Sequence, residues 1–234
     1  MAANVVPPEV LPQGNGLSRP QTRTLREWVL NQLTESILNG SMPPGYRMVE
    51  SALSAELGVS RSPLREALRQ LEQDGLIITL PNTSTVVAPI RRSDIDEIFE
   101  IRLGLEPFMA GYAAGNAKPS AFDICYRFNL ELRKSTNGIG FARADFALHH
   151  HLWSMTNRPR ITSFLQSLSR QALRQLALTA HGLSEADRRK TFDEHQYLLD
   201  AVASGDPAAA TAAMQDHLNA GRSRILAVLE QDMT

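Results

Sequence analysis

Two short helical segments joined by a tight turn, between residues 50 and 75, restrict the possible folds of this chain more than any other feature. The first segment, over residues 50–57, ends at Gly58, whose backbone freedom suits a sharp turn between two crossing helices. Either Ser60 or Ser62 can cap the second segment, which ends near residue 75. This arrangement predicts a helix-turn-helix.

The segments on both sides of this motif extend it. Residues 25–38 place apolar side chains on one helical face, and the Asn39-Gly40 pair, followed by two prolines, ends that helix. After residue 75 the pattern changes, because the β-branched segments LIITL and TVVA flank the turn-forming PNTS. Three helices and a hairpin in a continuous stretch predict a winged helix-turn-helix.

The rest of the chain is predicted to be helical. A capping box at Ser93-x-x-Asp96 opens the first helix, a gap at residues 135–140 precedes the third, and Ser184 and Asp206 cap the last two. The expected helices cover residues 93–115, 119–134, 141–157, 159–181, 185–203 and 207–232. The predicted fold is therefore mainly α, with a winged helix-turn-helix followed by an antiparallel bundle of six helices.

Composition and organisation narrow the function classes. We expect a flexible leader (1–23), a winged domain (24–89) and a helical domain (93–232). The single cysteine, Cys125, forms no internal disulfide, and no apolar run reaches the roughly 18 residues of a membrane span, so a cytoplasmic protein is expected. The formal net charge is −1, so any surface that binds nucleic acid has to be local.

Three arginines follow the turn at a spacing of four residues: Arg61, Arg65 and Arg69. This spacing places them on one face of the predicted helix, opposite its apolar residues. Guanidinium groups bind phosphate and the paired acceptors of guanine in the major groove, and hydroxyls such as those of Ser60 and Ser62 donate to phosphate. A solvated helix face is the alternative interpretation, but the neighbouring elements favour a DNA-reading helix.

The sequence around these arginines resembles the DNA-binding domain of GntR-family regulators. The shared motifs are an I-x-x-G-x-x-P-P-G start, a GVSRSPLREAL core and an L-x-x-D-G-L segment before the hairpin. The resemblance implies DNA contacts by the second helix of the motif and by the hairpin tip, namely by Arg61, Ser62, Arg65, Asn82 and Thr83. The chain departs from the family pattern at Ser51, where a basic residue is common, and at the tip, which lacks the usual glycine.

All six histidines lie in the helical half: His149, His150, His151, His181, His195 and His217. Asp145 and His149 are four residues apart and project from one helix face, and facing helices of a bundle can bring His195 and His217 to the same point. One carboxylate and three imidazoles suit a divalent transition metal such as Zn²⁺, Ni²⁺ or Mn²⁺. From spacing alone, the alternative is a set of surface or core histidines, and this stays the expectation for the other three.

The helical half as a whole resembles the FCD ligand-binding domain of the FadR-like branch of GntR regulators. The likeness rests on the segments DIDEIFEIRLGLEPFMAGYAA, ADFALHHHLW and EHQYLLDAVASGDPAAATAAMQDHL. It implies a metal bound by Asp145, His149, His195 and His217, and a small organic or sugar acid bound beside that metal. The cation that neutralises this acid is expected to be Arg102 or, less directly, Arg170 or Arg174. For Arg102 the alternative is a salt bridge to Glu100 or Glu106.

The sequence thus predicts a ligand-responsive regulator of transcription, in particular a repressor, and not an enzyme. A homodimer on double-stranded operator DNA is expected, because one recognition helix reads few base pairs and two-fold symmetry doubles the readout. Two alternatives stay open at this point. One is an FCD regulator that binds its ligand without a metal, and the other is a metal-dependent hydrolase that uses the same four residues to activate water.

Overall fold

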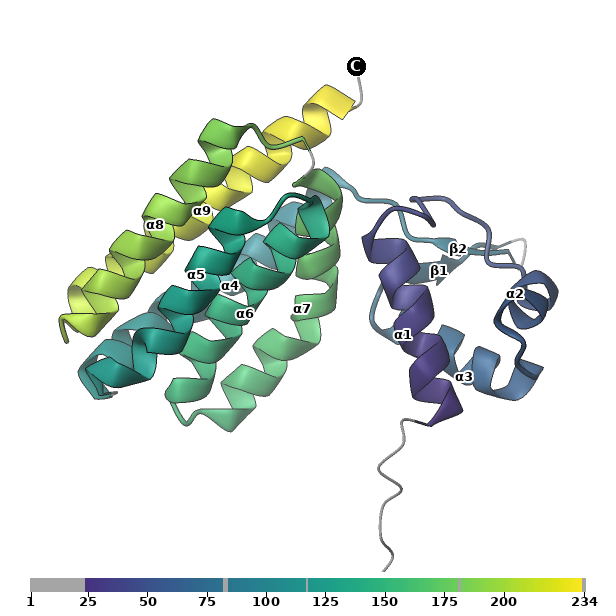
Figure 1. Ribbon diagram of the computed structural model, residues 1–234, viewed down its shortest axis with the longest axis horizontal. Coiled ribbons are helices and arrows are strands. Elements are labelled where there is room, and N and C mark those ends of the chain that lie inside the picture. The colour runs from purple at the N-terminus through teal and green to yellow at the C-terminus, as the bar shows by residue number, and fades with distance from the viewer. Residues whose placement is uncertain (1–23, 82–83, 117, 181, 233–234) are drawn as a thin grey trace, which may run out of the picture.

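The protein was analysed as a computed structural model that describes residues 24–81, 84–116, 118–180 and 182–232. Figure 1 shows a winged part and a helical bundle that lie side by side, joined by a short connection after the hairpin. The expected leader and the hairpin-tip residues Asn82 and Thr83 lie outside the described residues. Among the helices that are described, none is both long and apolar enough to cross a membrane.

The winged part contains the predicted three helices and hairpin. Its elements are α1 (Leu25–Leu38), α2 (Glu50–Leu57), α3 (Arg61–Gln73), β1 (Ile77–Thr79) and β2 (Thr85–Val87). The two strands pair antiparallel, and Ile78 lies opposite Val86. Buried aliphatic side chains of all three helices and of the hairpin form one core. Because that core fixes α3 through its apolar face, the arginine face of α3 is left toward solvent.

Gly58 produces the turn between α2 and α3. Its φ of 63° lies in the left-handed region, which glycine adopts without the steric cost that a Cβ would add. Ser60 stands at the N-cap of α3 with extended backbone, but its side chain accepts no capping hydrogen bond, and Ser62 lies inside the first turn. The position of the turn was therefore predicted correctly, whereas the side-chain cap expected there is not formed.

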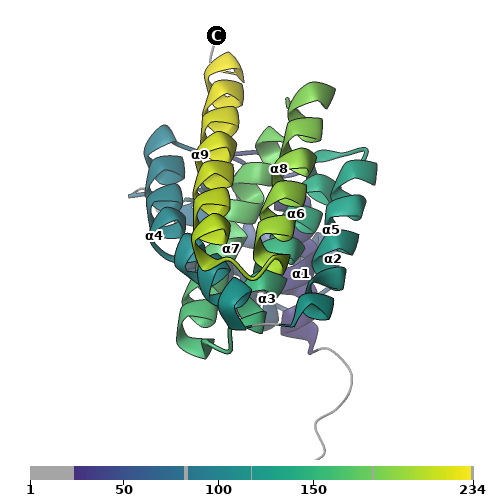
Figure 2. The same cartoon turned by 90° about the vertical axis from the view of Figure 1, so that its left-hand side faces the viewer.

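The second part is the predicted helical bundle. Its elements are α4 (Arg92–Asn116), the 3-10 turn η1 (Pro119–Phe122), α5 (Asp123–Lys134), α6 (Gly138–Met155), α7 (Pro159–Thr179), α8 (Glu185–Ala203) and α9 (Pro207–Asp232). Figure 2 shows α4, α8 and α9 along one side of the bundle. Buried side chains from α4, α5, α6, α8 and α9 make up the main core. This core holds α6, α8 and α9 in register at mid-length, where the candidate metal ligands are found.

Two helix starts differ from the prediction. Helix α4 begins at Arg92. At its start the backbone N–H of Arg91 donates to the carboxylate of Asp94, so the capping contact does not come from the predicted Ser93–Asp96 box. Helix α6 begins at Gly138, inside the predicted gap, because the Asn137 side chain accepts a hydrogen bond from the Gly140 amide at 2.8 Å. A capping side chain thus outweighs the low helix propensity of glycine at this position.

The winged part contacts the bundle mainly through α7. Arg174 of α7 donates a hydrogen bond to the carbonyl of Ala88, in the segment that follows the hairpin. Leu38, the last residue of α1, packs in a small cluster with Ala177 of α7. Gly75, at the end of α3, lies so close to Gln171 that a Cβ there would be 2.6 Å from its amide nitrogen. One helix of the bundle therefore touches the first helix, the recognition helix and the connecting segment of the winged part.

Candidate metal site and nucleic-acid interface

The four residues predicted to bind a metal meet in the middle of the bundle. Asp145 and His149 lie one turn apart on the same face of α6, His195 comes from α8 and His217 from α9. All four are buried, and each offers one ligand atom within 4.8 Å of the others. Within the described part of the chain, therefore, the expected set of one carboxylate and three imidazoles is a spatial cluster and not only a sequence pattern.

The spacing of the donor atoms suits a bound cation. Nε2 of His217 lies 3.1 Å from Nε2 of His149 and 3.2 Å from Nε2 of His195. Nε2 of His195 lies 3.4 Å from Oδ1 of Asp145. Adjacent ligand atoms around a metal with bonds of about 2.1 Å are about 3.0 to 3.4 Å apart, for octahedral and tetrahedral geometry respectively. These three pairs of donors are thus separated as neighbouring ligands of one ion would be, and all four donors lie within 4.8 Å of one another.

Each imidazole is oriented from behind by a hydrogen-bond acceptor. Nδ1 of His149 lies 2.6 Å from Oε2 of Glu106, and Nδ1 of His217 lies 3.2 Å from Oε2 of Glu194. Because ionised carboxylates only accept, both Nδ1 atoms carry the proton. The Nε2 lone pairs of these rings therefore point at one another, an arrangement that a cation between them stabilises.

The third imidazole has a neutral acceptor behind it. Nδ1 of His195 lies 3.3 Å from Oδ1 of Asn129, and Nδ2 of Asn129 donates to the carbonyl of Phe192 at 3.0 Å. The second bond fixes the orientation of the amide, so the oxygen of Asn129 accepts from His195. All three rings consequently turn Nδ1 to an acceptor and Nε2 to the centre of the cluster.

Burial favours the neutral form of two of the imidazoles, which is the form that metals bind. Desolvation lowers the pKa of His195 well below its ordinary value, and the neighbouring His217 and His149 lower it further. Desolvation also lowers the pKa of His217, partly offset by its hydrogen bond to Glu194. Neutral imidazoles bind a metal without first losing a proton, so these two ligands are ready for a cation at neutral pH.

The two carboxylates behind the rings stay charged although they are buried. Burial on its own raises the pKa of Glu106, but Arg102 and His149 outweigh this and hold the pKa at about 2. Burial likewise raises the pKa of Glu194, and His217 and Arg224 bring it down to about 2. Two Arg–Glu–His chains thus end at the cluster, one through His149 and one through His217.

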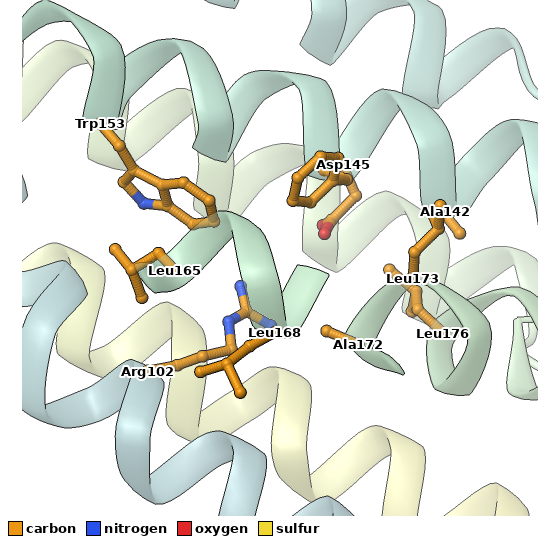
Figure 3. A pocket seen from close by; sticks show the side chains of 10 residues that line it. Arg102, Ala142, Asp145, Trp153, Leu165, Leu168, Ala172, Leu173 and Leu176 are labelled. Carbon is orange, nitrogen blue, oxygen red and sulfur yellow. The ribbon is translucent and has the colours of Figure 1, made fainter. Parts of the chain in front are cut away.

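Two small cavities flank the cluster, and Arg102 and Asp145 line both of them. Figure 3 shows the ends of these two side chains pointing toward one another across the first cavity. The Nε atom of Arg102 donates to Glu106 at 2.5 Å, and its Nη atoms have no hydrogen-bond partner among the described residues. Arg102 therefore makes the salt bridge to Glu106, which was one of its two expected roles. Its Nη atoms are available for the other expected role, which is binding the carboxylate of an effector.

The structure places Arg174, another candidate for effector binding, away from the cluster. Arg174 lines neither cavity, since it points to the connecting segment and donates to Ala88. The side chain of Arg170 lies outside what the structure describes. Of the two candidate arginines whose side chains the structure describes, Arg102 lies beside the histidine cluster and Arg174 does not.

Sequence reasoning missed most of the side chains that support the histidines. Asn129 was not singled out, nor were Glu194 and Arg224, and Glu106 was considered only as a partner of Arg102. A signal was present for one pair, because Glu106 lies four residues after Arg102 on the same helix. The others belong to different helices, and only the packing of the bundle brings them to the rings.

The other two histidines that the structure describes do not join the cluster. The ring of His150 packs against Phe146 and Trp153, at centroid distances of 5.9 and 6.1 Å. The ring of His151 lies 6.3 Å from that of Phe128. His181 lies outside the described residues. His150 and His151 thus pack beside aromatic rings on the outer face of α6.

The predicted DNA-reading face is exposed on α3. The side chains that form it are all exposed to solvent: Ser60, Arg61, Ser62, Arg65 and Arg69. Of these three arginines, Arg65 has an ion-pair partner in the described structure. Its Nε atom lies 2.9 and 3.1 Å from the two carboxylate oxygens of Glu50, at the start of α2. An acidic side chain therefore holds one of the candidate DNA contacts in place before any DNA is bound.

Comparison with known families agrees with both parts of the molecule. Residues 25–87 match the family described as bacterial regulatory proteins, gntR family, and residues 97–220 match the FCD domain. In solved structures, the fold is similar to McbR/YncC of E. coli (TM-score 0.74, 20% identity, 91% of this chain and 100% of that one). It is equally similar to a GntR regulator from Rhodococcus sp. RHA1 (TM-score 0.74, 24% identity, 88% of this chain and 99% of that one).

Related sequences span nearly the whole chain. The HTH-type transcriptional regulator Rv0494 of Mycobacterium tuberculosis is 30% identical, over 93% of this chain and 96% of its own length. A protein of Paenarthrobacter nicotinovorans, named "Probable D-xylose utilization operon transcriptional repressor", is 27% identical over 87% and 90% of the two chains. These relatives are regulators and not enzymes, which removes the hydrolase alternative. The chain belongs to the GntR family of bacterial regulatory proteins, carries a C-terminal FCD domain, and is a DNA-binding transcriptional regulator.

Proposed function

We propose that this protein is a ligand-responsive repressor that binds operator DNA through α3. The observation that supports this most directly is the exposed row of arginines on that helix, with its apolar face fixed in the core of the winged part. Arg61, Arg65 and Arg69 would reach phosphates and base edges in the major groove, and Ser60 and Ser62 would donate to phosphate. Asn82 and Thr83 at the hairpin tip would add minor-groove contacts.

Binding as a homodimer to a pseudo-palindromic operator follows from the size of this face. One helix contacts only a few base pairs, and a two-fold dimer doubles the readout and fixes the spacing of the half-sites. Residues 24–89 would read the DNA and residues 93–232 would sense the ligand. The protein would work in the cytoplasm, where a bacterial operator is found.

The helical part would hold a divalent transition metal, Zn²⁺, Ni²⁺ or Mn²⁺, on Asp145, His149, His195 and His217. The converging Nε2 atoms, their spacing and the lowered pKa values of His195 and His217 support this assignment. When bound, such an ion supplies a Lewis-acidic point for a carboxylate. The free Nη atoms of Arg102 would bind the same small organic or sugar acid from the side of α4.

Helix α7 would carry the signal from this site to the DNA-binding part. Its inner face lines the first cavity, and Arg174 and Gln171 on the same helix touch the connecting segment and the end of α3. A ligand that binds better to one arrangement of α7 than to another shifts the population of winged parts that are able to bind the operator.

A mobility-shift assay with the gene's own upstream region tests the DNA-binding proposal. We expect the double variant Arg61→Ala, Arg65→Ala to lose operator binding, while Arg160→Ala, which removes an exposed arginine of α7, binds like the wild type. Unchanged binding by the double variant would refute the assignment of α3 as the recognition helix.

Metal analysis of purified protein separates the metal-dependent regulator from a metal-free FCD regulator. His149→Ala and His195→Ala should each lose most of the bound metal, whereas His151→Ala, which changes a histidine outside the cluster, should keep it. Full retention by both cluster variants would contradict the assigned site.

A further inference from the structure

The first cavity beside the histidine cluster has almost entirely apolar walls. Besides Arg102 and Asp145, it is lined by Ala142, Phe146, Trp153, Leu165, Leu168, Ala172, Leu173 and Leu176. The indole nitrogen of Trp153 is already used, because it donates to Glu106 at 3.3 Å. The polar end of the cavity is therefore limited to Arg102 and Asp145, and the rest of the wall offers neither donors nor acceptors.

From this arrangement we infer that the effector is a monocarboxylate with a hydrocarbon tail, and not a sugar acid or a dicarboxylate. The inference rests on the proposed function, since it specifies the acid that the proposed site binds. The carboxylate would lie at Arg102 and the metal, and the tail would extend between α6 and α7, where Leu168 and Leu173 form the wall (Figure 3).

The wall discriminates against hydroxyl groups. A hydroxyl that leaves water for an apolar cavity without a new hydrogen-bond partner loses binding free energy, whereas each buried methylene gains it. A sugar acid would bring several hydroxyls to a wall that has no partner for them. A tail of the same length without hydroxyls would match the surface of Trp153 and the leucines of α7.

The charges around the cluster favour a single negative charge on the ligand. Arg102, Arg224 and a divalent ion supply four positive charges, and Glu106, Glu194 and Asp145 supply three negative ones. One carboxylate balances the remaining charge. A second carboxylate at the far end of the ligand would lie among leucines without a partner, and burying such a charge is costly.

The cavity is small, so the tail has to displace one of its walls. The space open to water is about 20 Å³ in this cavity and about 30 Å³ in the one on the other side of Arg102, which is room for about one or two water molecules. The side chains of Leu168, Ala172, Leu173 and Leu176 are only half-buried, so α7 is the less tightly packed wall. A tail that moves α7 acts on the helix that touches the winged part.

Titration calorimetry of the full-length, metal-loaded protein with three six-carbon acids tests the inference. Hexanoate, gluconate and adipate have the same number of carbons and differ in hydroxyls or in charge. We expect hexanoate to bind at least about tenfold more tightly than either of the others. Equal or tighter binding of gluconate or adipate would overturn the inference.

Two variants link the preference to the cavity wall. Leu168→Asn should weaken hexanoate binding about fivefold or more and improve the relative affinity for gluconate, whereas Leu130→Asn, which changes an exposed leucine of α5, should alter neither. An unchanged preference in Leu168→Asn would also overturn the inference.

The same titrations separate this inference from the proposed function. If gluconate or adipate bound as tightly as hexanoate, and Arg102→Met abolished that binding, the proposed carboxylate site would be supported. Only the inferred preference for a hydrocarbon tail would then be refuted. If none of the three acids bound at millimolar concentration, both the inference and the proposed carboxylate site would be refuted.

Discussion

Glu106 accepts a hydrogen bond from Nδ1 of His149 at 2.6 Å in a fully buried position. The same carboxylate pairs with Arg102, so one side chain connects a candidate metal ligand to the candidate effector-binding cation. This contact fixes the tautomer of His149 with Nε2 toward the cluster. The metal site and the effector site are therefore linked through Glu106 and cannot be altered independently at this residue.

Replacing Glu106 by glutamine should weaken metal binding about 10- to 100-fold, because the amide no longer fixes the His149 tautomer with a full negative charge. Competition with a chromophoric chelator measures the change. Glu100→Gln, on an exposed turn of the same helix, removes an equal charge and should bind metal like the wild type. Equal affinities in both variants would show that Glu106 has no part in orienting the ligand.

The fold, and the placement of Asp145 and His149 on one helix face, could be predicted from the sequence for a physical reason. Residue periodicity reports which face of a helix is buried, and the spacing of Asp145 and His149 places both on one face whatever the tertiary structure is. Glu106 is different, because nothing local shows whether its carboxylate turns to Arg102, to a histidine or to solvent. That outcome depends on how α4 packs against α6, which is a property of the whole bundle.

Acidification should destabilise the metal-free protein. Burial lowers the pKa of His195 and His217 in the folded state, so below the ordinary value of about 6.5 the unfolded chain binds more protons than the folded one. The free energy of unfolding should therefore fall as the pH falls through 6.5, by at most about 1.4 kcal/mol per histidine and pH unit. Urea unfolding in the presence of a chelator at pH 7.5, 6.5 and 5.5 measures this slope.

Substitution of one histidine identifies the source of that slope. His195→Gln should reduce the fall in stability between pH 6.5 and 5.5, whereas His151→Gln, in which a half-buried histidine outside the cluster is changed, should retain it. A wild-type stability that stays constant or increases on acidification would contradict the neutral state assigned to these rings.

The ion pair between Arg65 and Glu50 should tune the selectivity of DNA binding. Glu50 lies 2.9 Å from Arg65 and brings a negative charge to the DNA-reading face. In Glu50→Gln that charge is removed and Arg65 loses its ion-pair partner. The affinity for random-sequence DNA should therefore increase about two- to tenfold at low salt. The ratio of operator affinity to random-sequence affinity should fall. Fluorescence anisotropy with both DNAs over a range of salt concentrations measures the two effects.

Glu56→Gln is the matched control, because Glu56 is also an exposed acid of α2 but makes no ion pair within the described structure. We expect it to change both affinities by a similar, smaller factor and to leave the ratio unchanged. If the two variants reduced the ratio equally, the contact with Arg65 would be irrelevant and only the net charge would matter.

Arg174 should transmit the ligand signal without contributing to either binding site. It is buried, donates to the carbonyl of Ala88, and has an Nε atom without a hydrogen-bond partner in the described structure. Desolvation lowers its pKa to about 10, an effect that Asp94 only partly offsets. A buried cation with so little compensation adds little stability, and replacing such a group by an apolar side chain of similar length is often neutral.

In Arg174→Met we therefore expect the free energy of unfolding to stay within about 1 kcal/mol of the wild type. Operator affinity without ligand and carboxylate affinity without DNA should also be retained. The factor by which the carboxylate changes operator affinity should instead fall toward one, because α7 no longer holds the segment at Ala88. Anisotropy titrations of the operator with and without saturating carboxylate measure that factor. A variant that keeps the full factor would exclude the Arg174–Ala88 contact as the route between the two parts, and coupling would then have to pass through another contact, such as the packing of Leu38 on α7 or of Gln171 beside Gly75.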